Sequence, residues 1–323
     1  MTAWGPAPSV SSDGARPAKV LKPVILITGA GGQLGRELLR ARWSDKASVC
    51  GYTSAELDIR NPDAVGSIVD TLRPDVIVNA AAYTAVDRAE DEPEEAEAVN
   101  VTAVKTLANA ANHVNALLVH ISTDYVFNGT KAGWYTEADP ISPIGVYGRT
   151  KADGEQAAEA AHKLLTLRTS WVYGALGSNF VTTMLRLGSE RDELGVVADQ
   201  VGCPTSAGDL ARAITAVAAA VAYGTETVPR RLYHLAGPDA MTWFEFAQVV
   251  FASSRRCGDV VVRPITTDQY PTRAARPANS RLDSSAALAD FGVELPPAAR
   301  SIANVVGQLE SAPRPDRPPL TES

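Results

Sequence analysis

The sequence has few cysteines and histidines, which makes several classes of protein improbable. Its 323 residues contain three cysteines, Cys50, Cys203 and Cys257, which lie far apart and form no CxxC pair. A disulfide framework or a zinc site therefore has little support, and the three residues are expected to be buried thiols in a reducing compartment. The four histidines lack the spacing of metal ligands, so no metal site is predicted.

The chain also lacks an excess of basic residues and any long apolar segment. Lysine and arginine number 30 against 37 aspartates and glutamates, a formal net charge of -7. An acidic surface argues against a nucleic acid or an anionic membrane as partner, and favours a small molecule or another protein. No stretch offers the ~18 apolar residues of a membrane span, and residues 1–20 contain no apolar signal segment, so we expect a cytoplasmic protein.

Proline, serine and other small or polar residues dominate both ends of the chain. Residues 1–20 and 312–323 hold too little apolar surface to offset the entropy lost on ordering. We therefore expect a disordered N-terminal extension and a flexible C-terminal tail.

Short apolar runs alternate with helical patterns through most of the chain. The runs span residues 24–28, 48–52, 75–82, 116–123, 164–170 and 232–237. Continuous Val/Ile/Leu runs suit strands that are buried on both faces, and amphipathic segments between them suit crossover helices, so the pattern predicts an α/β fold with a doubly wound parallel sheet.

The regular alternation ends after about residue 174, where loops and separated helices follow. We expect an NAD(P)-binding Rossmann domain over 21–174, to which a later strand near 231–237 returns. Residues 175–311 are then expected to form mainly a smaller substrate-binding lobe.

A glycine-rich turn joins the first predicted strand to a helical pattern. Gly29 permits a tight turn, Gly32 lets backbone amides approach a pyrophosphate, and Gly35 allows close packing of helix on strand. The predicted cofactor contacts in this turn are Gly29, Gly31, Gly32, Gln33, Leu34 and Gly35. The alternative is a plain glycine-rich turn with no ligand.

The second predicted strand ends near Tyr52 and Thr53 without the acidic residue that usually binds the ribose 2′-hydroxyl of NAD. NADPH is therefore an acceptable cofactor, and NADH remains plausible. Arg36 or Arg60 could meet the 2′-phosphate, although an arginine in such a place is more often just a solvated surface charge. Asp58 and Ile59 follow in a loop that could contact adenine, and a helix-capping role for Asp58 is nearly as well supported.

Small and polar residues follow two further predicted strands. Ala80, Ala81 and Ala82 would let a cofactor lie against a strand end, or else reflect tight packing. Ser122, Thr123, Asp124 and Tyr125 stand at the carboxyl end of the fourth strand, where open α/β sheets bind ligands. Hydroxyl groups in that position can also merely satisfy a loop.

Tyr147 and Lys151 lie four positions apart in a helical pattern and would face the same side of the helix. A nearby ammonium favours the phenolate, but lowering a tyrosine pKa from 10 to ~7 requires about 4 kcal/mol, which a pair in open water does not supply. The spacing alone leaves two interpretations open: an acid with its electrostatic helper, or two solvent-facing side chains.

The ordered set of motifs narrows the choice. The glycine turn, "NAAA", "STD" and YxxxK together resemble the extended short-chain dehydrogenase/reductases. The rarer segments "VNAAAYTAVDRAE", "STDYVFNG", "RTSWVYG", "DQVGCPT" and "RPANSRLD" look like the dTDP-4-dehydrorhamnose reductase family, and the likeness covers roughly residues 22–310.

This resemblance implies a reaction and roles for individual residues. The family reduces the C4 ketone of dTDP-4-dehydro-β-L-rhamnose with a nicotinamide hydride and yields dTDP-L-rhamnose, the last step of its biosynthesis. Tyr147 would be the proton donor, Lys151 would lower its pKa and hold the nicotinamide ribose, and Thr123 would position the keto oxygen. Asp124 and Tyr125 would lie beside the substrate.

Four residues of the second lobe are further substrate candidates. Trp171 can offer an aromatic wall and Asn179 can hydrogen-bond, while Arg276 and Arg281 suit a pyrophosphate because guanidinium groups pair with its oxygens bidentately. For Trp171 a position in the core is about as well supported as a place in the binding site. For the two arginines a purely structural role is less well supported than a binding role.

The resemblance also bears on assembly and on alternative functions. Some relatives dimerise through Mg²⁺ and surface glutamates, with which Glu37 and Glu190 are compatible, so a homodimer is plausible, but isolated surface glutamates are usually just solvated and no metal is assigned. The alternatives are a reductase of another dTDP-4-keto-6-deoxysugar, or a non-catalytic regulatory subunit of the methionine adenosyltransferase type.

Overall fold

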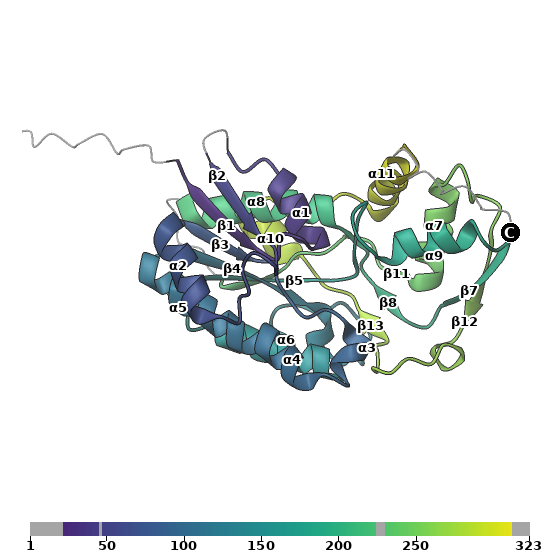
Figure 1. The fold of residues 1–323 in the computed structure, drawn as a ribbon. Helices are drawn as coiled ribbons and strands as arrows, with labels where there is room; N and C mark the ends of the chain where they lie inside the picture. Colours follow the sequence, from purple (N-terminus) through teal and green to yellow (C-terminus); the bar gives the residue numbers. More distant parts are fainter. Residues whose placement is uncertain (1–21, 45–46, 224–229, 312–323) are drawn as a thin grey trace, which may run out of the picture.

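The computed structural model describes residues 22–44, 47–223 and 230–311. The two tails predicted at 1–20 and 312–323 lie outside the described residues. Figure 1 shows a larger part built on a twisted sheet and a smaller part beside it.

A six-stranded parallel sheet forms the larger part. In spatial order its strands are β10 (Leu232–His234), β5 (Lys163–Thr169), β4 (Leu117–Thr123), β3 (Val76–Asn79), β1 (Val24–Thr28) and β2 (Ser48–Tyr52). Each apolar run of the sequence contributes one strand, as predicted. From β1 the chain runs to β2 on one side and then to β3 on the other, so the strand order reverses between β1 and β3. Open α/β sheets bind their ligands at such a reversal.

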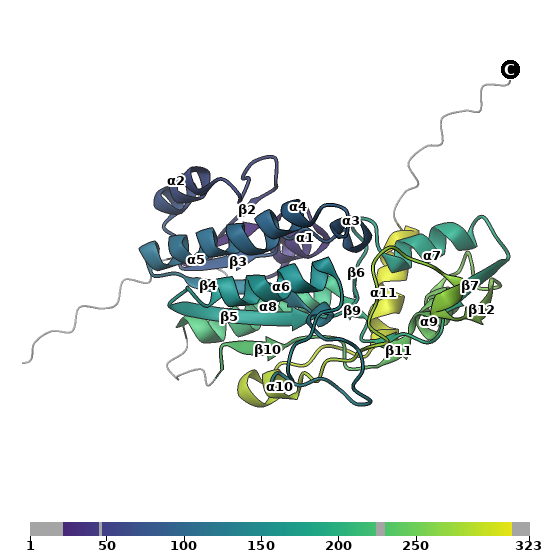
Figure 2. The ribbon, with the colours of Figure 1, turned by 90° about the horizontal axis from the view of Figure 1, so that it is seen from below.

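Helices cover both faces of this sheet, which confirms the doubly wound, Rossmann-type fold (Figure 2). One face carries α1 (Gln33–Arg40), α8 (Ala207–Tyr223) and α10 (Ser285–Phe291). The other carries α2 (Pro62–Leu72), α5 (Ala103–Val114) and α6 (Val146–Ala158).

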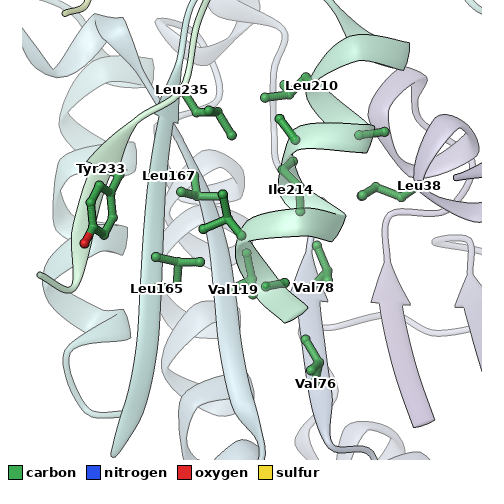
Figure 3. Packing of buried hydrophobic residues seen from close by; sticks show 14 of the residues in the cluster. Leu38, Val76, Val78, Val119, Leu165, Leu167, Leu210, Ile214, Tyr233 and Leu235 are labelled. Atoms are coloured by element: carbon green, nitrogen blue, oxygen red, sulfur yellow. The ribbon is translucent and has the colours of Figure 1, made fainter. Parts of the chain in front are cut away.

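The core between α8 and the sheet consists of aliphatic side chains from both layers. Figure 3 shows Leu210 and Ile214 of α8 facing Val78, Val119 and Leu167 of the strands. Each such side chain contributes about 1.5 to 3 kcal/mol when it is fully buried. This packing fixes the strand ends, and therefore the residues that follow them, relative to one another.

The smaller lobe has its own core. Its helices are α7 (Phe180–Gly188), α9 (Trp243–Ser253) and α11 (Ala298–Ser311). A parallel pair, β7 (Glu193–Val197) with β12 (Val261–Ile265), packs beside them. Within the range 175–311 that we expected to form mainly this lobe, α8 and α10 cover the sheet instead.

Short elements connect the two parts. A three-stranded sheet contains β11 (Met241–Thr242), β8 (Val201–Gly202) and β13 (Asn279–Ser280), and β6 (Val172–Tyr173) pairs with β9 (Thr205–Ser206). The remaining helical segments are α3 (Val86–Ala89), α4 (Pro93–Glu97), η1 (Ala98–Thr102), η2 (Asp124–Val126) and η3 (Thr267–Gln269).

Two glycines allow α6 to approach its neighbours closely. A Cβ on Gly148 would lie 2.3 Å from the carbonyl oxygen of Tyr125, and one on Gly154 would lie 2.1 Å from that of Asn100. Real Cβ atoms do not approach backbone so closely, so these positions require glycine. These contacts hold α6 against η2 (Asp124–Val126), the turn that directly follows β4, and against η1 (Ala98–Thr102).

Candidate active site

A cleft of about 990 Å³ lies at the carboxyl ends of β1, β3 and β4 and is bounded on its other side by the smaller lobe. Fifteen of the predicted site residues line it: Gly29, Gly31, Gly32, Gln33, Leu34, Asp58, Ala80, Ala81, Ala82, Thr123, Asp124, Tyr125, Tyr147, Lys151 and Trp171. Five others, all within the described part of the chain, lie outside its lining: Gly35, Ile59, Asn179, Arg276 and Arg281.

The glycine turn has the geometry of a phosphate-binding loop. Gly29 has φ +70°, and a Cβ there would lie 2.5 Å from the backbone nitrogen of Ala81. A Cβ on Gly35 would lie 2.2 Å from the carbonyl oxygen of Gly29, so this glycine packs the helix onto the turn. Gly32 is the N-cap of α1 and lines the cleft, where a phosphate group would meet the positive end of the helix dipole.

The end of β2 carries an acidic side chain that the sequence reasoning missed. Glu56 folds back so that its Oε2 accepts hydrogen bonds from the backbone nitrogen of Thr53 at 2.9 Å and from its hydroxyl at 2.8 Å. These bonds lower the pKa of Glu56, so it is ionised at neutral pH. An acid therefore does stand close to this strand end, bound to Thr53, and a Thr–x–x–Glu turn is the local signal that predicts it.

Arg60, a candidate for the 2′-phosphate, already pairs with two carboxylates. Its Nε and NH2 groups donate to Asp58 at 2.8 to 3.1 Å, and NH1 donates to Glu95 Oε1 at 2.5 Å. All three side chains line the cleft. A 2′-phosphate would have to compete with these carboxylates for the guanidinium, and exposed ion pairs of this kind are weak enough to rearrange.

Thr123 and Asp124 form a buried polar pair at the end of β4. The Thr123 hydroxyl donates to Asp124 Oδ1 at 3.0 Å and accepts from the backbone nitrogen of Tyr125 at 3.3 Å. Burial raises the pKa of Asp124 to about 6, and hydrogen bonds from nearby hydroxyl groups oppose the rise. Thr123 is therefore held in one orientation by its own neighbours.

Tyr147 and Lys151 both face the cleft, so the alternative of two solvent-facing residues is wrong. Tyr147 is half-buried, and its ring packs edge-on against that of Tyr125 with centroids 5.4 Å apart. Lys151 is 2% exposed, and its Nζ donates to the carbonyl oxygen of Ile121 at 2.6 Å.

The two groups have shifted pKa values. Burial raises the pKa of Tyr147 to about 12, and a hydrogen bond with the Thr123 hydroxyl acts in the opposite direction. Burial lowers the pKa of Lys151 to about 8, because a desolvated ammonium is disfavoured. Tyr147 therefore retains its proton at neutral pH in this arrangement, as a proton donor must before it reacts.

The smaller lobe contributes an aromatic wall. Trp171 lines the cleft and stacks on Trp243, with ring centroids 3.5 Å apart and planes within 6°. Trp171 has φ +47°, an uncommon conformation for a bulky residue. Trp243 also lines the cleft, and sequence reasoning missed it because nothing in "TWFEFA" distinguishes it from a core tryptophan.

Asn179 joins the lobe to the glycine turn. It is the N-cap of α7, and its Oδ1 accepts from the backbone nitrogen of Thr182 at 3.1 Å. Its Nδ2 donates to Gln33 Oε1 at 3.0 Å and to the carbonyl oxygen of Gly174 at 2.8 Å. These three contacts of the side chain are all within the protein, and a substrate contact for Asn179 stays a prediction.

The two predicted pyrophosphate arginines also have partners within the protein. Arg276 pairs with Asp87 Oδ2 at 2.8 Å, which ties its loop to α3. Arg281 donates to Asn279 Oδ1 at 2.8 Å and to the carbonyl oxygen of Ala132 at 2.6 Å. Their role toward a pyrophosphate stays a prediction.

No group of three or more His, Cys, Asp or Glu side chains within residues 22–44, 47–223 and 230–311 is arranged to hold a metal ion. Glu37 lies 3.7 Å from Arg40, and Glu190 pairs with Arg186 at 3.1 Å. None of the helices in the same ranges is long and apolar enough to cross a membrane.

Comparison with known proteins places this geometry in a family. The chain is 46% identical over 292 residues to a dTDP-4-dehydrorhamnose reductase of Aggregatibacter actinomycetemcomitans, a match that covers 88% of this chain and 99% of the relative. It is 43% identical over 286 residues to the protein of the same name in Escherichia coli K12, covering 84% of this chain and 93% of that one.

A solved structure of the same enzyme has a similar fold. A dTDP-4-dehydrorhamnose reductase of Bacillus anthracis in complex with NADP superposes with a TM-score of 0.81 at 36% identity, covering 89% of this chain and 99% of that chain. The family profile described as RmlD substrate binding domain matches residues 23–311. The chain therefore belongs to the RmlD substrate binding domain family.

Proposed function

We propose that this protein reduces the C4 ketone of dTDP-4-dehydro-β-L-rhamnose to dTDP-L-rhamnose with NADPH as hydride donor, and that NADH also serves. One observation carries the proposal: Thr123, Tyr147 and Lys151 converge at the end of β4 in the same cleft as the glycine turn. Relatives at 43% to 46% identity bear the name of this enzyme.

The cleft fits a nicotinamide dinucleotide. The pyrophosphate would bind at Gly31 and Gly32, the adenosine would lie toward Asp58, and the alanines after β3 would let the cofactor pass along the strand end. Lys151 would hold the nicotinamide ribose. When bound, the cofactor would supply the hydride that adds to the ketone carbon.

Tyr147 supplies the proton. As hydride adds to C4, negative charge grows on the keto oxygen, and the Tyr147 hydroxyl donates its proton there to give the alcohol. The Thr123 hydroxyl holds the ketone oxygen toward Tyr147. The positive charge of Lys151 stabilises the phenolate that results, which then takes a proton from solvent.

The smaller lobe would bind the dTDP-sugar. Trp171, backed by Trp243, presents a flat apolar face to the sugar or the thymine. Asp124 and Tyr125 would contact the substrate beside Thr123, and Arg276 and Arg281 would reach its pyrophosphate after exchanging their present partners.

A direct assay of cofactor oxidation tests the proposal. Purified protein is mixed with dTDP-4-dehydrorhamnose and NADPH or NADH, cofactor oxidation is followed by absorbance, and the product sugar is identified by NMR. Oxidation with a different C4 epimer as product would favour a reductase of another dTDP-4-keto-6-deoxysugar. Failure of folded, cofactor-binding protein to oxidise either cofactor would favour the non-catalytic, regulatory-subunit alternative.

A further inference from the structure

A buried ion pair joins α6, the helix that carries Lys151, to β5. The side chains of Arg168 on β5 and Glu155 on α6 are 4% and 12% exposed. Arg168 donates through Nε to Glu155 Oε1 at 2.8 Å and through NH2 to Oε2 at 2.7 Å. The Ser122 hydroxyl donates to the same carboxylate at 2.5 Å. Three hydrogen bonds therefore hold one carboxylate in place, which is the condition under which a buried ion pair is tolerated.

This carboxylate shares its surroundings with Lys151. Glu155 follows Lys151 by four positions on α6, so the two side chains leave the same face of the helix. The Lys151 ammonium contacts the carbonyl oxygen of Ile121, and Glu155 contacts the hydroxyl of the next residue, Ser122. Both side chains thus end beside adjacent residues of β4, away from bulk solvent.

We propose that Glu155 is a positioning residue that acts through Lys151: its fixed negative charge keeps Lys151 protonated in the buried site, while Arg168 and Ser122 fix Glu155. The role in turnover rests on the proposed function, because it needs Lys151 to carry a positive charge during ketone reduction. The electrostatic relation between the two residues does not depend on it.

Other titratable groups near Lys151 do not replace Glu155. His120 on β4 is fully buried, and burial together with the charge of Lys151 lowers its pKa well below the usual range, so it is neutral. His234 on β10 lies 3.5 Å from Arg168, and burial lowers its pKa to about 3. Tyr147 is protonated and therefore uncharged, and Asp124 is hydrogen-bonded to Thr123. Glu155 opposes the effect of burial on the pKa of Lys151.

The test is a direct titration of Lys151 in the whole protein. Lysine labelled with ¹³C at Cε is followed by NMR against pH, and Lys151→Met assigns the signal. In Glu155→Gln the pKa of Lys151 should fall by roughly one pH unit, because the negative charge that favours the protonated form is lost. The alkaline limb of kcat should move to lower pH by the same amount, and Glu155→Asp should restore it in part.

A matched control lies one turn farther along. Glu159 follows α6 at its C-cap and pairs with Arg231 at the surface, so Glu159→Gln removes the same charge outside the buried site. It should leave the Lys151 titration unchanged.

In Glu155→Gln the buried Arg168 loses the carboxylate that balances its charge, so that variant could fail to fold. The double variant Glu155→Gln with Arg168→Met removes both charges. Its Lys151 pKa should still fall, by less, because Arg168 lies one strand farther from the Lys151 contact on β4. A wild-type Lys151 titration in a folded single or double variant overturns the inference, as does a loss of kcat that is uniform across pH. A wild-type protein without ketone-dependent cofactor oxidation would instead refute the proposed function, and the NMR titration would still decide this inference.

Discussion

Tyr147 is the residue on which the proposed chemistry depends most directly. Its hydroxyl lines the cleft beside Thr123, and burial keeps it protonated. Tyr147→Phe retains the ring and its packing on Tyr125 but removes the proton donor, so kcat should fall by ~10² to 10⁴ while cofactor affinity is retained. Steady-state kinetics and a cofactor fluorescence titration measure both. Thr123→Val, which loses one hydrogen bond, is the comparison and should cost less. A folded Tyr147→Phe protein with most of its activity would end the catalytic assignment.

Arg276 offers a second prediction at the scale of a single side chain. Its ion pair with Asp87 joins two segments that are 189 residues apart in the sequence. If the guanidinium binds the substrate pyrophosphate, Arg276→Ala should raise KM for the dTDP-sugar and leave cofactor Kd unchanged, since each lost charge-assisted bond is worth roughly 1.5 to 3 kcal/mol. Asp87→Asn is the matched variant, because it releases the guanidinium and should affect KM much less. A weakened cofactor Kd in Arg276→Ala would assign the residue to the other half of the cleft.

The glycine turn allows a prediction at the scale of an element. A Cβ on Gly35 would overlap the carbonyl oxygen of Gly29 at 2.2 Å, whereas one on Gly32 would lie 3.3 Å from the same atom. Gly35→Ala should therefore lower the free energy of unfolding by ~1 to 3 kcal/mol, a typical cost of overpacking. Gly32→Val should unfold with nearly the free energy of the wild-type protein. It should lower the affinity for NADPH and NADH alike, because the added side chain blocks the approach of the pyrophosphate. Thermal melts and cofactor titrations separate the two effects, and unchanged cofactor affinity in folded Gly32→Val would show that the turn does not bind the pyrophosphate.

The contact between α7 and the glycine turn gives a second prediction at the scale of an element. Asn179→Asp keeps an oxygen that can cap α7 but removes the amide that donates to Gln33 and to Gly174. We expect stability to change by less than ~1 kcal/mol, while the cofactor dissociates several-fold faster because the lobe no longer holds the turn. Stopped-flow dissociation measures this rate. Gln33→Met, which breaks the same contact from the other side, should have the same effect, and no further loss is expected in the double variant.

At the scale of the whole molecule, the buried His234 contributes to how stability depends on pH. Burial, aided by the charge of Arg168, lowers the pKa of His234 to about 3 in the folded protein, so between pH 6.5 and 3 the unfolded chain binds a proton that the folded chain does not. Stability therefore falls as pH falls through this window, by up to roughly 5 kcal/mol for this residue. Asp124 acts in the opposite sense, because its raised pKa means that the folded state takes up its proton first, near pH 6.

Denaturant unfolding at several pH values tests this dependence. His234→Gln should flatten the slope of stability against pH between 3 and 6.5, even if it lowers stability at neutral pH. His113→Gln is the control, since His113 is exposed and pairs with Asp70 at the surface. An unchanged slope in folded His234→Gln would contradict the prediction.

The predicted homodimer is a separate question that light scattering on the purified protein answers.

Much of the fold could be predicted from the sequence because its signals are local. A run such as "VILIT" is apolar enough to be a buried strand wherever it lies, and a glycine turn followed by a helical pattern fixes the first βα unit. Because Tyr147 and Lys151 are four residues apart, they lie on the same face of any helix that contains both. These features depend on neighbours within a few residues, which the sequence shows directly.

The sequence by itself thus determined where the strands and the glycine turn lie along the chain, and that Tyr147 and Lys151 share one face of their helix. Tertiary structure alone decided which distant side chains meet: Arg276 with Asp87, Asn179 with Gln33, and Trp171 with Trp243. Periodicity and spacing carry no information on such pairs, because their distance depends on how the lobe and the helices pack on the sheet. For the same reason, three residues predicted to bind substrate, Asn179, Arg276 and Arg281, were found with partners inside the protein. Glu155 could not be singled out until α6 was placed on β4 and β5.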